Sequence, residues 1–133
     1  MTDLTKHFVV PFAEAFDARY GLEYVTPTHG RLSIRPDLLG ADGTVQSGVY
    51  MAMAESLAST GTAVEVVPHG LIPSGLSNCT YVIGEAREGV LQAHARCRAR
   101  GDGEWLWDVE IGPPDGAATA IAAVVIAVRP KRV

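Results

Sequence analysis

Residues 48–67 read GVYMAMAESLASTGTAVEVV, and this stretch decides the fold. Nearly every side chain in it is apolar or small, and its first charged residue is Glu55. A helix without a polar face must be covered by other parts of the protein. Ser47 is a suitable N-cap for this helix, and the PHG sequence at 68–70 ends it. The stretch therefore predicts one long buried helix at the centre of the domain.

The segments on either side of this helix supply the cover. Residues 8–20 carry apolar side chains at helical spacing, and residues 22–36 read as two short strands with a turn at 28–30. Beyond the central helix we expect four more strands, with a hairpin turn at 101–103 and the last strand at 117–128. That last strand is apolar on both faces, which favours cover by the helix on one side and by a partner subunit on the other. The predicted fold class is α+β, an antiparallel sheet wrapped around one long buried helix.

Composition limits the classes of protein to which the chain can belong. Its 133 residues predict a single domain, 1–133, and 47% hydrophobic against 20% charged residues is typical of a globular protein. A net charge of −4 argues against a general nucleic-acid binder. The sequence shows no signal peptide and no stretch long enough to span a bilayer, so we expect a cytoplasmic protein. Cys79 and Cys97 cannot form a metal site by themselves, and no cofactor is predicted.

Glu55 is the residue that breaks the apolar pattern of the central helix. A lone buried carboxylate is costly unless it is paired or protonated, so its presence needs a reason. Ser59 and Thr62 follow it at helical spacing and predict a narrow polar stripe. One interpretation is a structural Glu bonded by these hydroxyls, or one that faces a wet dimer groove. The other is a carboxylate that acts as nucleophile or general base.

The start of the same helix is a second feature with chemical potential. The residues Gln46-Ser47-Gly48 lead into it, and helix-start N–H groups carry partial positive charge that can stabilise an oxyanion. Ser47 and Glu55 are about 12 Å apart along a helix, too far to touch one carbonyl carbon. Two helices packed antiparallel across a two-fold axis would bring each N-terminus to the partner's Glu. The helix thus indicates a site shared between subunits.

Five stretches of the chain carry a family resemblance, and they occur in the order GVYMAMAESLAST, SGLSNCTYV, REGVLQAHARCRA, EWLWDVEIG and AVVIAVRPKR. Together they resemble the hotdog-fold thioesterases, most closely the 4-hydroxybenzoyl-CoA thioesterase branch that uses a Glu on the central helix. The resemblance covers about residues 45–132. It implies a sheet wrapped around the helix, two subunits paired into one continuous sheet, and dimers that associate into tetramers.

The resemblance also implies roles for single residues. It places the catalytic carboxylate at Glu55, the N–H that polarises the thioester carbonyl at Ser47 with Gly48 beside it, and the assisting hydroxyl at Ser59. The expected substrate-binding residues are Gln46, Asn78, Arg129 and Arg132. For Asn78 a structural role within its strand is the favoured interpretation. No metal and no cofactor belong to this site.

Two further regions bear on substrate binding. We expect the acyl group to lie beside the helix, near Met51, Met53, Asn78 and the N-terminal segment. Arg96, Arg98 and Arg100 share a predicted strand face with His94, at residues 94–100. This face is interpreted either as a solvated or subunit-facing surface, or as a docking site for CoA phosphates or an acidic acyl-carrier protein.

The sequence departs from the family's pattern at several positions. Gln46-Ser47-Gly48 stands where the family has His-Gly-Gly, Gly40 stands where it has a loop Gln, and Gly84, Asp102 and Gly103 stand where it holds CoA phosphates. Two functions therefore stay open. The first is a thioesterase acting on an acyl or aryl thioester of CoA or of an acyl-carrier protein. The second is a non-catalytic hotdog protein that binds a small ligand or an acyl-carrier partner.

Overall fold

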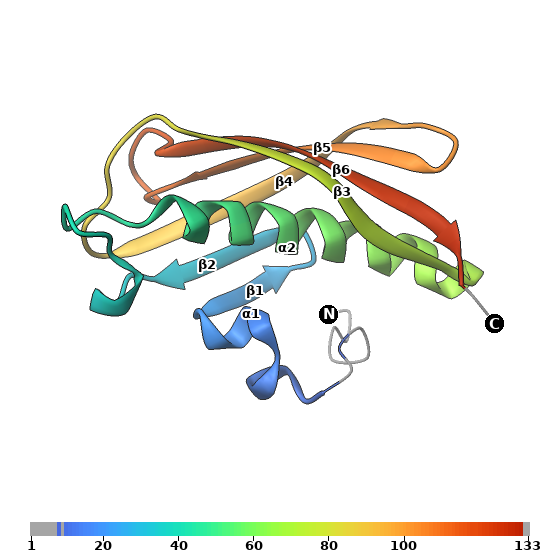
Figure 1. Cartoon of the computed structure of the whole chain (residues 1–133), viewed down its shortest axis with the longest axis horizontal. Helices are drawn as coiled ribbons and strands as arrows, with labels where there is room; N and C mark the ends of the chain where they lie inside the picture. Colours follow the sequence, from blue (N-terminus) through green and yellow to red (C-terminus); the bar gives the residue numbers. More distant parts are fainter. Residues whose placement is uncertain (1–7, 9, 132–133) are drawn as a thin grey trace.

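The long apolar stretch forms helix α2 (Ser47–Val66), which lies along one face of a curved antiparallel sheet (Figure 1). The computed structural model describes residues 8 and 10–131. The six strands of the sheet stand in the order β1-β2-β4-β5-β6-β3, and their bounds are β1 Leu22–Thr26, β2 His29–Ser33, β3 Leu71–Val82, β4 Val90–Arg100, β5 Glu104–Gly112 and β6 Ala120–Pro130. The α+β class and the wrapping of the sheet around one helix are confirmed. Strand β3 follows α2 directly but lies at the edge of the sheet, beside β6.

The two ends of α2 differ in how well the sequence predicts them. At the C-terminal end the 3-10 turn η4 (Val67–His69) and Gly70, with φ +77°, stop the helix as expected. At the other end Ser47 is the first helical residue and not the cap, so that prediction was wrong. Gln46 occupies the cap position with extended backbone, because its N–H donates to the Leu38 carbonyl oxygen at 3.0 Å. This hydrogen bond across the loop places the start of the helix.

The N-terminal segment does not form the predicted helix over residues 8–20. It is divided into the 3-10 turn η2 (Phe12–Glu14) and the short helix α1 (Phe16–Arg19). Ala15, buried between them, has extended backbone with φ −75° and ψ 157°. The break directs the side chain of Asp17 toward α2, where it accepts a hydrogen bond from Ser56 at 2.8 Å. A tertiary contact thus overrides the helical spacing of the apolar residues.

The turn between β1 and β2 also differs from the prediction. It falls at Pro27 and Thr28, while His29 and Gly30 already belong to β2. Proline lacks the N–H that a ladder position needs, which favours the turn at this point. Gly30 faces the core, where an added Cβ would lie 2.8 Å from a Leu22 methyl group.

The last strand begins later than the sequence predicted, since β6 begins at Ala120 and not at residue 117. The turn at 101–103 joins β4 and β5 as predicted.

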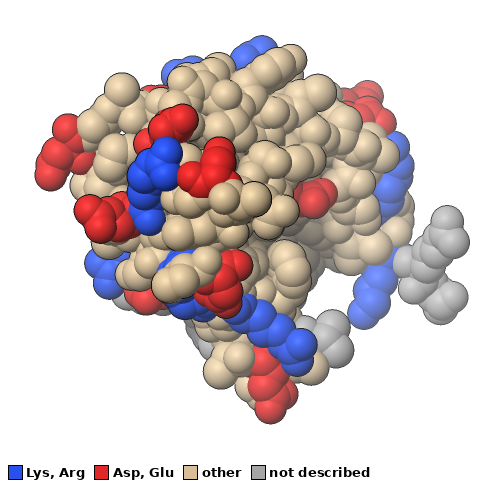
Figure 2. Space-filling model, turned by 60° about the vertical axis from the view of Figure 1, so that its left-hand side comes forward, with Lys and Arg blue, Asp and Glu red and all other residues tan. Residues whose placement is uncertain are grey.

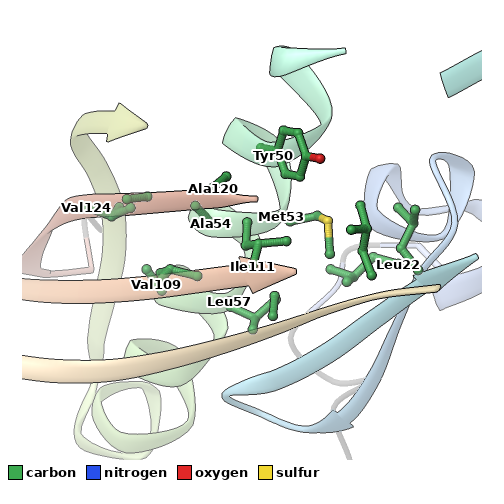
Figure 3. Packing of buried hydrophobic residues seen from close by; sticks show 14 of the residues in the cluster. Leu22, Tyr50, Met53, Ala54, Leu57, Val109, Ile111, Ala120 and Val124 are labelled. Atoms are coloured by element: carbon green, nitrogen blue, oxygen red, sulfur yellow. The ribbon is translucent and has the colours of Figure 1, made fainter. Parts of the chain in front are cut away.

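The core lies between α2 and the sheet (Figure 3). Tyr50, Met53 and Leu57 project from α2 and are at most 1% exposed. They pack with buried side chains of the flanking strands, among them Leu22, Val109, Ile111, Ala120 and Val124. Met53 is therefore enclosed by the protein itself, and its place beside the acyl group stays a prediction. Nowhere in residues 8 and 10–131 is there a helix long and apolar enough to cross a bilayer.

A pair of stacked imidazoles lies on the outer face of the sheet. His29 on β2 pairs with His94 on β4, and their ring centroids are 4.1 Å apart. The sequence placed His29 in a turn, but in the structure its Nε2 is buried and has no hydrogen-bond partner in the described part of the chain. Burial of the ring, followed by repulsion from His94, lowers the pKa of His29 below 6.5. The folded protein thus disfavours the charged imidazole.

This stack predicts a loss of stability in mild acid. The unfolded chain takes up the His29 proton near pH 6.5, and the folded chain takes it up only at lower pH, so the free energy of unfolding falls as the pH drops below 6.5. We expect urea titrations at pH 7.5 and pH 5 to show this fall. His29→Gln removes the titrating group and should lose less stability over the same interval. An equal loss in both proteins would contradict the assignment.

Candidate active site

Glu55 lies on the side of α2 that the sheet leaves open. Its side chain is exposed, whereas the sequence suggested a carboxylate inside a helix covered all round. The expectation failed because the sheet covers only part of the helix circumference, and Gly48, Met51 and Glu65 are exposed as well. Thr62 does not extend the polar stripe, since it is fully buried and accepts a hydrogen bond from Trp107 Nε1 at 2.9 Å.

The Glu55 carboxylate rests against the edge strand β3. A Cβ added to Gly75 would lie 1.9 Å from Glu55 Oε1, so the carboxylate occupies the space that a side chain at this position would take. The pairing of β3 with β6 shifts register between Gly75 and Ser77, which is the mark of a β-bulge. β3 ends the strand order and has β6 as its only neighbour within the described sheet. The carboxylate therefore lies at the open edge of the sheet.

A pocket of about 310 Å³ lies beside this carboxylate. Glu55 and Ser59 line it together, as the sequence predicted for two residues one helical turn apart. Its apolar wall includes Phe8, Phe16 and Pro73 from outside the helix. A carboxylate at the rim of an apolar pocket can hold a water molecule or attack a carbonyl group whose apolar substituent fills the pocket.

A buried polar cluster forms another part of the pocket wall, and the sequence analysis missed it. Asp17 is 8% exposed and accepts hydrogen bonds from Tyr24 Oη at 2.6 Å and from Ser56 Oγ at 2.8 Å. Tyr24 also lies 2.9 Å from Thr60 Oγ1, so the cluster ties α1 and β1 to α2. Burial, followed by the charge of Asp17, raises the pKa of Tyr24 well above 10 and keeps its hydroxyl protonated. The sequence carries no signal for Asp17 comparable to that for Glu55, because Glu14 and Arg19 lie within three residues of it.

Removing one hydroxyl from this cluster should cost stability. Tyr24→Phe leaves Asp17 Oδ2 without the donor at 2.6 Å. A buried acceptor that loses its partner costs about 1–3 kcal/mol, so we expect the free energy of unfolding to fall by that amount. Urea denaturation measures it. Tyr81→Phe, at an exposed position, is the matched control and should change stability little. Equal effects of the two substitutions would show that the Asp17 cluster is not stabilising.

The predicted oxyanion residues lie at the start of the same helix. Gln46, Ser47 and Gly48 are all exposed, and a Cβ placed on Gly48 would meet only open space in the described part of the chain. They do not line the pocket that contains Glu55 and Ser59. Within one copy of the protein the structure therefore places the two halves of the expected site apart. Their catalytic roles stay predictions.

The expected substrate-binding residues have internal partners. Asn78 donates to the Met51 carbonyl oxygen at 3.0 Å and accepts from Thr80 Oγ1 at 2.7 Å, which ties β3 to α2. Arg129 donates to Glu104 at 2.8 Å and to the carbonyl oxygen of Gly103. Arg132 lies outside the described residues. Contact of these side chains with substrate stays a prediction.

Arg96 and Arg98 of β4 line a shallow cleft of about 670 Å³ on the outer face of the sheet. Arg98 donates to Asp108 at 2.8 Å, and Arg96 lies 4.0 Å from the same carboxylate. Arg100 leaves this row, because it lies 4.2 Å from the Trp105 ring and donates to Glu65. On the face shown in Figure 2, acidic and basic side chains lie among one another. Across residues 8 and 10–131, no three His, Cys, Asp or Glu side chains gather closely enough to hold a metal ion.

Comparisons with known proteins show which of them share this architecture. A protein of Mycobacterium tuberculosis named "putative esterase" is 33% identical over 102 residues, which are 72% of this chain and 73% of that protein. Its solved structure superposes with a TM-score of 0.83 at 30% identity, over 89% of this chain and 98% of that one. No family model matches the sequence.

Two more distant structures share the fold. A Pseudomonas aeruginosa thioesterase superposes with a TM-score of 0.81 at 22% identity, over 89% of this chain and 88% of that one. A Bacillus halodurans protein solved with CoA gives 0.78 at 14% identity, over 92% and 78%. Six antiparallel strands wrapped around one long helix, shared with these proteins, define a hotdog fold. The chain has this hotdog fold and belongs to the same family as the "putative esterase" of Mycobacterium tuberculosis.

Proposed function

We propose that the protein hydrolyses an acyl or aryl thioester, with Glu55 as the catalytic carboxylate. The observation that carries this proposal is the exposed Glu55 carboxylate beside the Ser59 hydroxyl, at the rim of the apolar pocket of about 310 Å³. The thioesterase and esterase names among its relatives support hydrolysis of this general class. The 4-hydroxybenzoyl-CoA branch is part of the proposal and rests on the order of the sequence motifs.

The chemistry needs a nucleophile, an oxyanion donor and a leaving thiolate. In one route Glu55 takes a proton from water as the water oxygen attacks the carbonyl carbon, and the C–S bond then breaks to release the thiol with that proton. In the other route Glu55 attacks the carbonyl carbon, and the C–S bond breaks to give an anhydride and a thiolate. Water then hydrolyses the anhydride to the free acid and the Glu55 carboxylate, and the proton released goes to the thiolate. In both routes the Ser47 N–H of a second copy, with Gly48 and Gln46 beside it, holds the developing oxyanion. Ser59 orients the carboxylate or the water.

We propose that two copies pair at strand β3 to complete the site. β3 is an unpaired edge in the described structure, and it exposes apolar side chains, including 58% of Leu76 and 62% of Tyr81. An exposed apolar edge strand is a template for pairing with another chain. Pairing there would bring the partner's groups to the side of α2 where Glu55 lies. Association of two such dimers into a tetramer is part of the same proposal.

CoA is the proposed carrier of the acyl group. The Bacillus halodurans neighbour solved with CoA supports this choice, and Arg129 and Arg132 near the end of β6 are the proposed phosphate contacts. Asn78 is the proposed contact to the acyl side of the substrate. The second carrier considered is an acyl-carrier protein, whose acidic surface the arginines of β4 would attract.

Release of free thiol from a thioester panel tests the proposal. The panel holds benzoyl-CoA, 4-hydroxybenzoyl-CoA, hexanoyl-CoA and the matching pantetheine esters, with wild type and Glu55→Ala in parallel. We expect wild-type turnover of at least one CoA ester and its loss in Glu55→Ala. Turnover of the pantetheine esters alone would indicate that the acyl group is carried by a carrier protein and not by CoA. A wild-type protein that turns over no ester would overturn the proposal that the protein is a hydrolase. The departures from the family pattern at Gln46 and Ser47 would then favour the ligand-binding alternative.

A further inference from the structure

We propose that Gly75 is a positioning residue, because its missing side chain creates the space in which the Glu55 carboxylate sits. The inference rests on the proposed catalytic role of Glu55. A Cβ at Gly75 would lie 1.9 Å from Oε1, 3.1 Å from Cδ and 3.8 Å from Cγ of Glu55. The outer half of the glutamate side chain is thus laid against the β3 backbone at this single position.

The backbone of Gly75 does not itself require glycine. Its φ lies outside the left-handed region in which glycine is favoured over other residues. It pairs with Ile126 of β6 and borders the register shift that precedes Ser77. Glycine inside a strand lowers stability and often marks a place where another group approaches closely. Here the group that approaches is the Glu55 carboxylate.

An added methyl group should displace the carboxylate and leave the strand in place. β3 is paired with β6 along its length, and Asn78 holds it to the Met51 carbonyl oxygen. The carboxylate is the free end of an exposed side chain and can rotate away. Real Cβ atoms do not come within 3.0 Å of a neighbouring atom, so Oε1 must move by at least about 1 Å.

This displacement is of the size that damages catalysis. A misplacement of about 1 Å in a reacting group can cost about 10²-fold in rate. Phe16 and Pro73 of the apolar pocket wall lie no nearer than 3.8 Å to the new methyl group, so it does not displace them. We therefore expect Gly75→Ala to lower kcat about 10²-fold and to change KM by less than about threefold. Its Tm should equal or exceed that of the wild type, because alanine suits a strand better than glycine.

The test measures kcat, KM and Tm on the best ester of the panel. Ser74→Ala is the matched control on β3, one residue before Gly75 and on the opposite face of the sheet, where it pairs with Ala127. It should keep wild-type kcat. A Gly75→Ala protein with kcat within twofold of wild type would overturn the inference, as would a loss of kcat that follows a lowered Tm.

A double-mutant cycle separates positioning from general damage. Glu55→Asp withdraws the carboxylate by one methylene, so adding Gly75→Ala to this variant should lower its kcat by less than about threefold. An equal loss of kcat from Gly75→Ala in the wild type and in the Glu55→Asp variant would contradict the inference. A crystal structure of Gly75→Ala tests the inference without an activity assay. We expect it to show the Glu55 carboxylate displaced by at least about 1 Å and β3 in its wild-type position. A wild type inactive on every ester overturns the proposed function alone, whereas an unmoved carboxylate in Gly75→Ala overturns the positioning role.

Discussion

Glu55→Ala is expected to lower thioester turnover by about 10²–10⁴-fold, the range that a positioned general base contributes. The Glu55 carboxylate lies at the rim of the pocket that Ser59 also lines, and both hydrolytic routes pass through it. The protein should fold normally, because Glu55 is exposed and alanine is a good helix former. Thiol release under saturating ester, together with Tm, measures the two effects separately.

Glu65→Ala is the matched control for this variant. Glu65 is a second exposed glutamate on α2, and its carboxylate accepts a hydrogen bond from Arg100 at 2.7 Å. An exposed ion pair of this kind contributes little to stability, so turnover and Tm should both stay close to wild type. Glu55→Gln keeps the shape of the side chain and removes its charge and its basicity. Unchanged turnover in Glu55→Gln would contradict the assignment of Glu55 as the catalytic carboxylate.

Trp107→Ala is expected to give the largest loss of stability, about 3–5 kcal/mol in the free energy of unfolding. Trp107 on β5 is 3% exposed, and its indole N–H donates to Thr62 Oγ1 at 2.9 Å. Its ring also lies against Gly61, where an added Cβ would come within 2.7 Å of the indole. The substitution removes this packing and leaves a cavity between α2 and the sheet. Urea denaturation of both proteins measures the difference.

Trp107→Phe separates packing from hydrogen bonding at the same position. It keeps an aromatic ring against Gly61 and removes the donor to Thr62, whose hydroxyl still donates to the Ala58 carbonyl oxygen at 2.8 Å. We expect a loss between those of wild type and Trp107→Ala. Trp105→Ala, at a half-buried position, should cost less than Trp107→Ala. A Trp107→Ala protein destabilised by less than about 1 kcal/mol would show that this cavity collapses at little cost.

The sequence alone predicted the elements whose signals are local. The apolar residues of 48–67 indicated a long central helix, and the turn residues at 101–103 indicated a hairpin, because both follow from the propensities of neighbouring residues. Glu55 could be singled out for the same reason, as the lone carboxylate in an apolar run. The break at Ala15 and the cap at Gln46 could not. The break accompanies a hydrogen bond between Asp17 and Ser56, 39 residues apart, and the cap depends on a hydrogen bond across the preceding loop to Leu38.

The surroundings of Glu55 were decided only by the tertiary structure. After α2 the chain enters β3, which lies at the edge of the sheet beside β6. This strand order places Gly75 against the Glu55 carboxylate, which is twenty residues earlier in the chain. It also leaves one side of α2 open, so Glu55 is exposed where its neighbours in sequence suggested burial. Asp17 reaches the same pocket by the packing of α1 on α2. The sequence alone thus determined which elements form and which carboxylate to examine, whereas the contacts of that carboxylate depend on strand order, which local propensity does not encode.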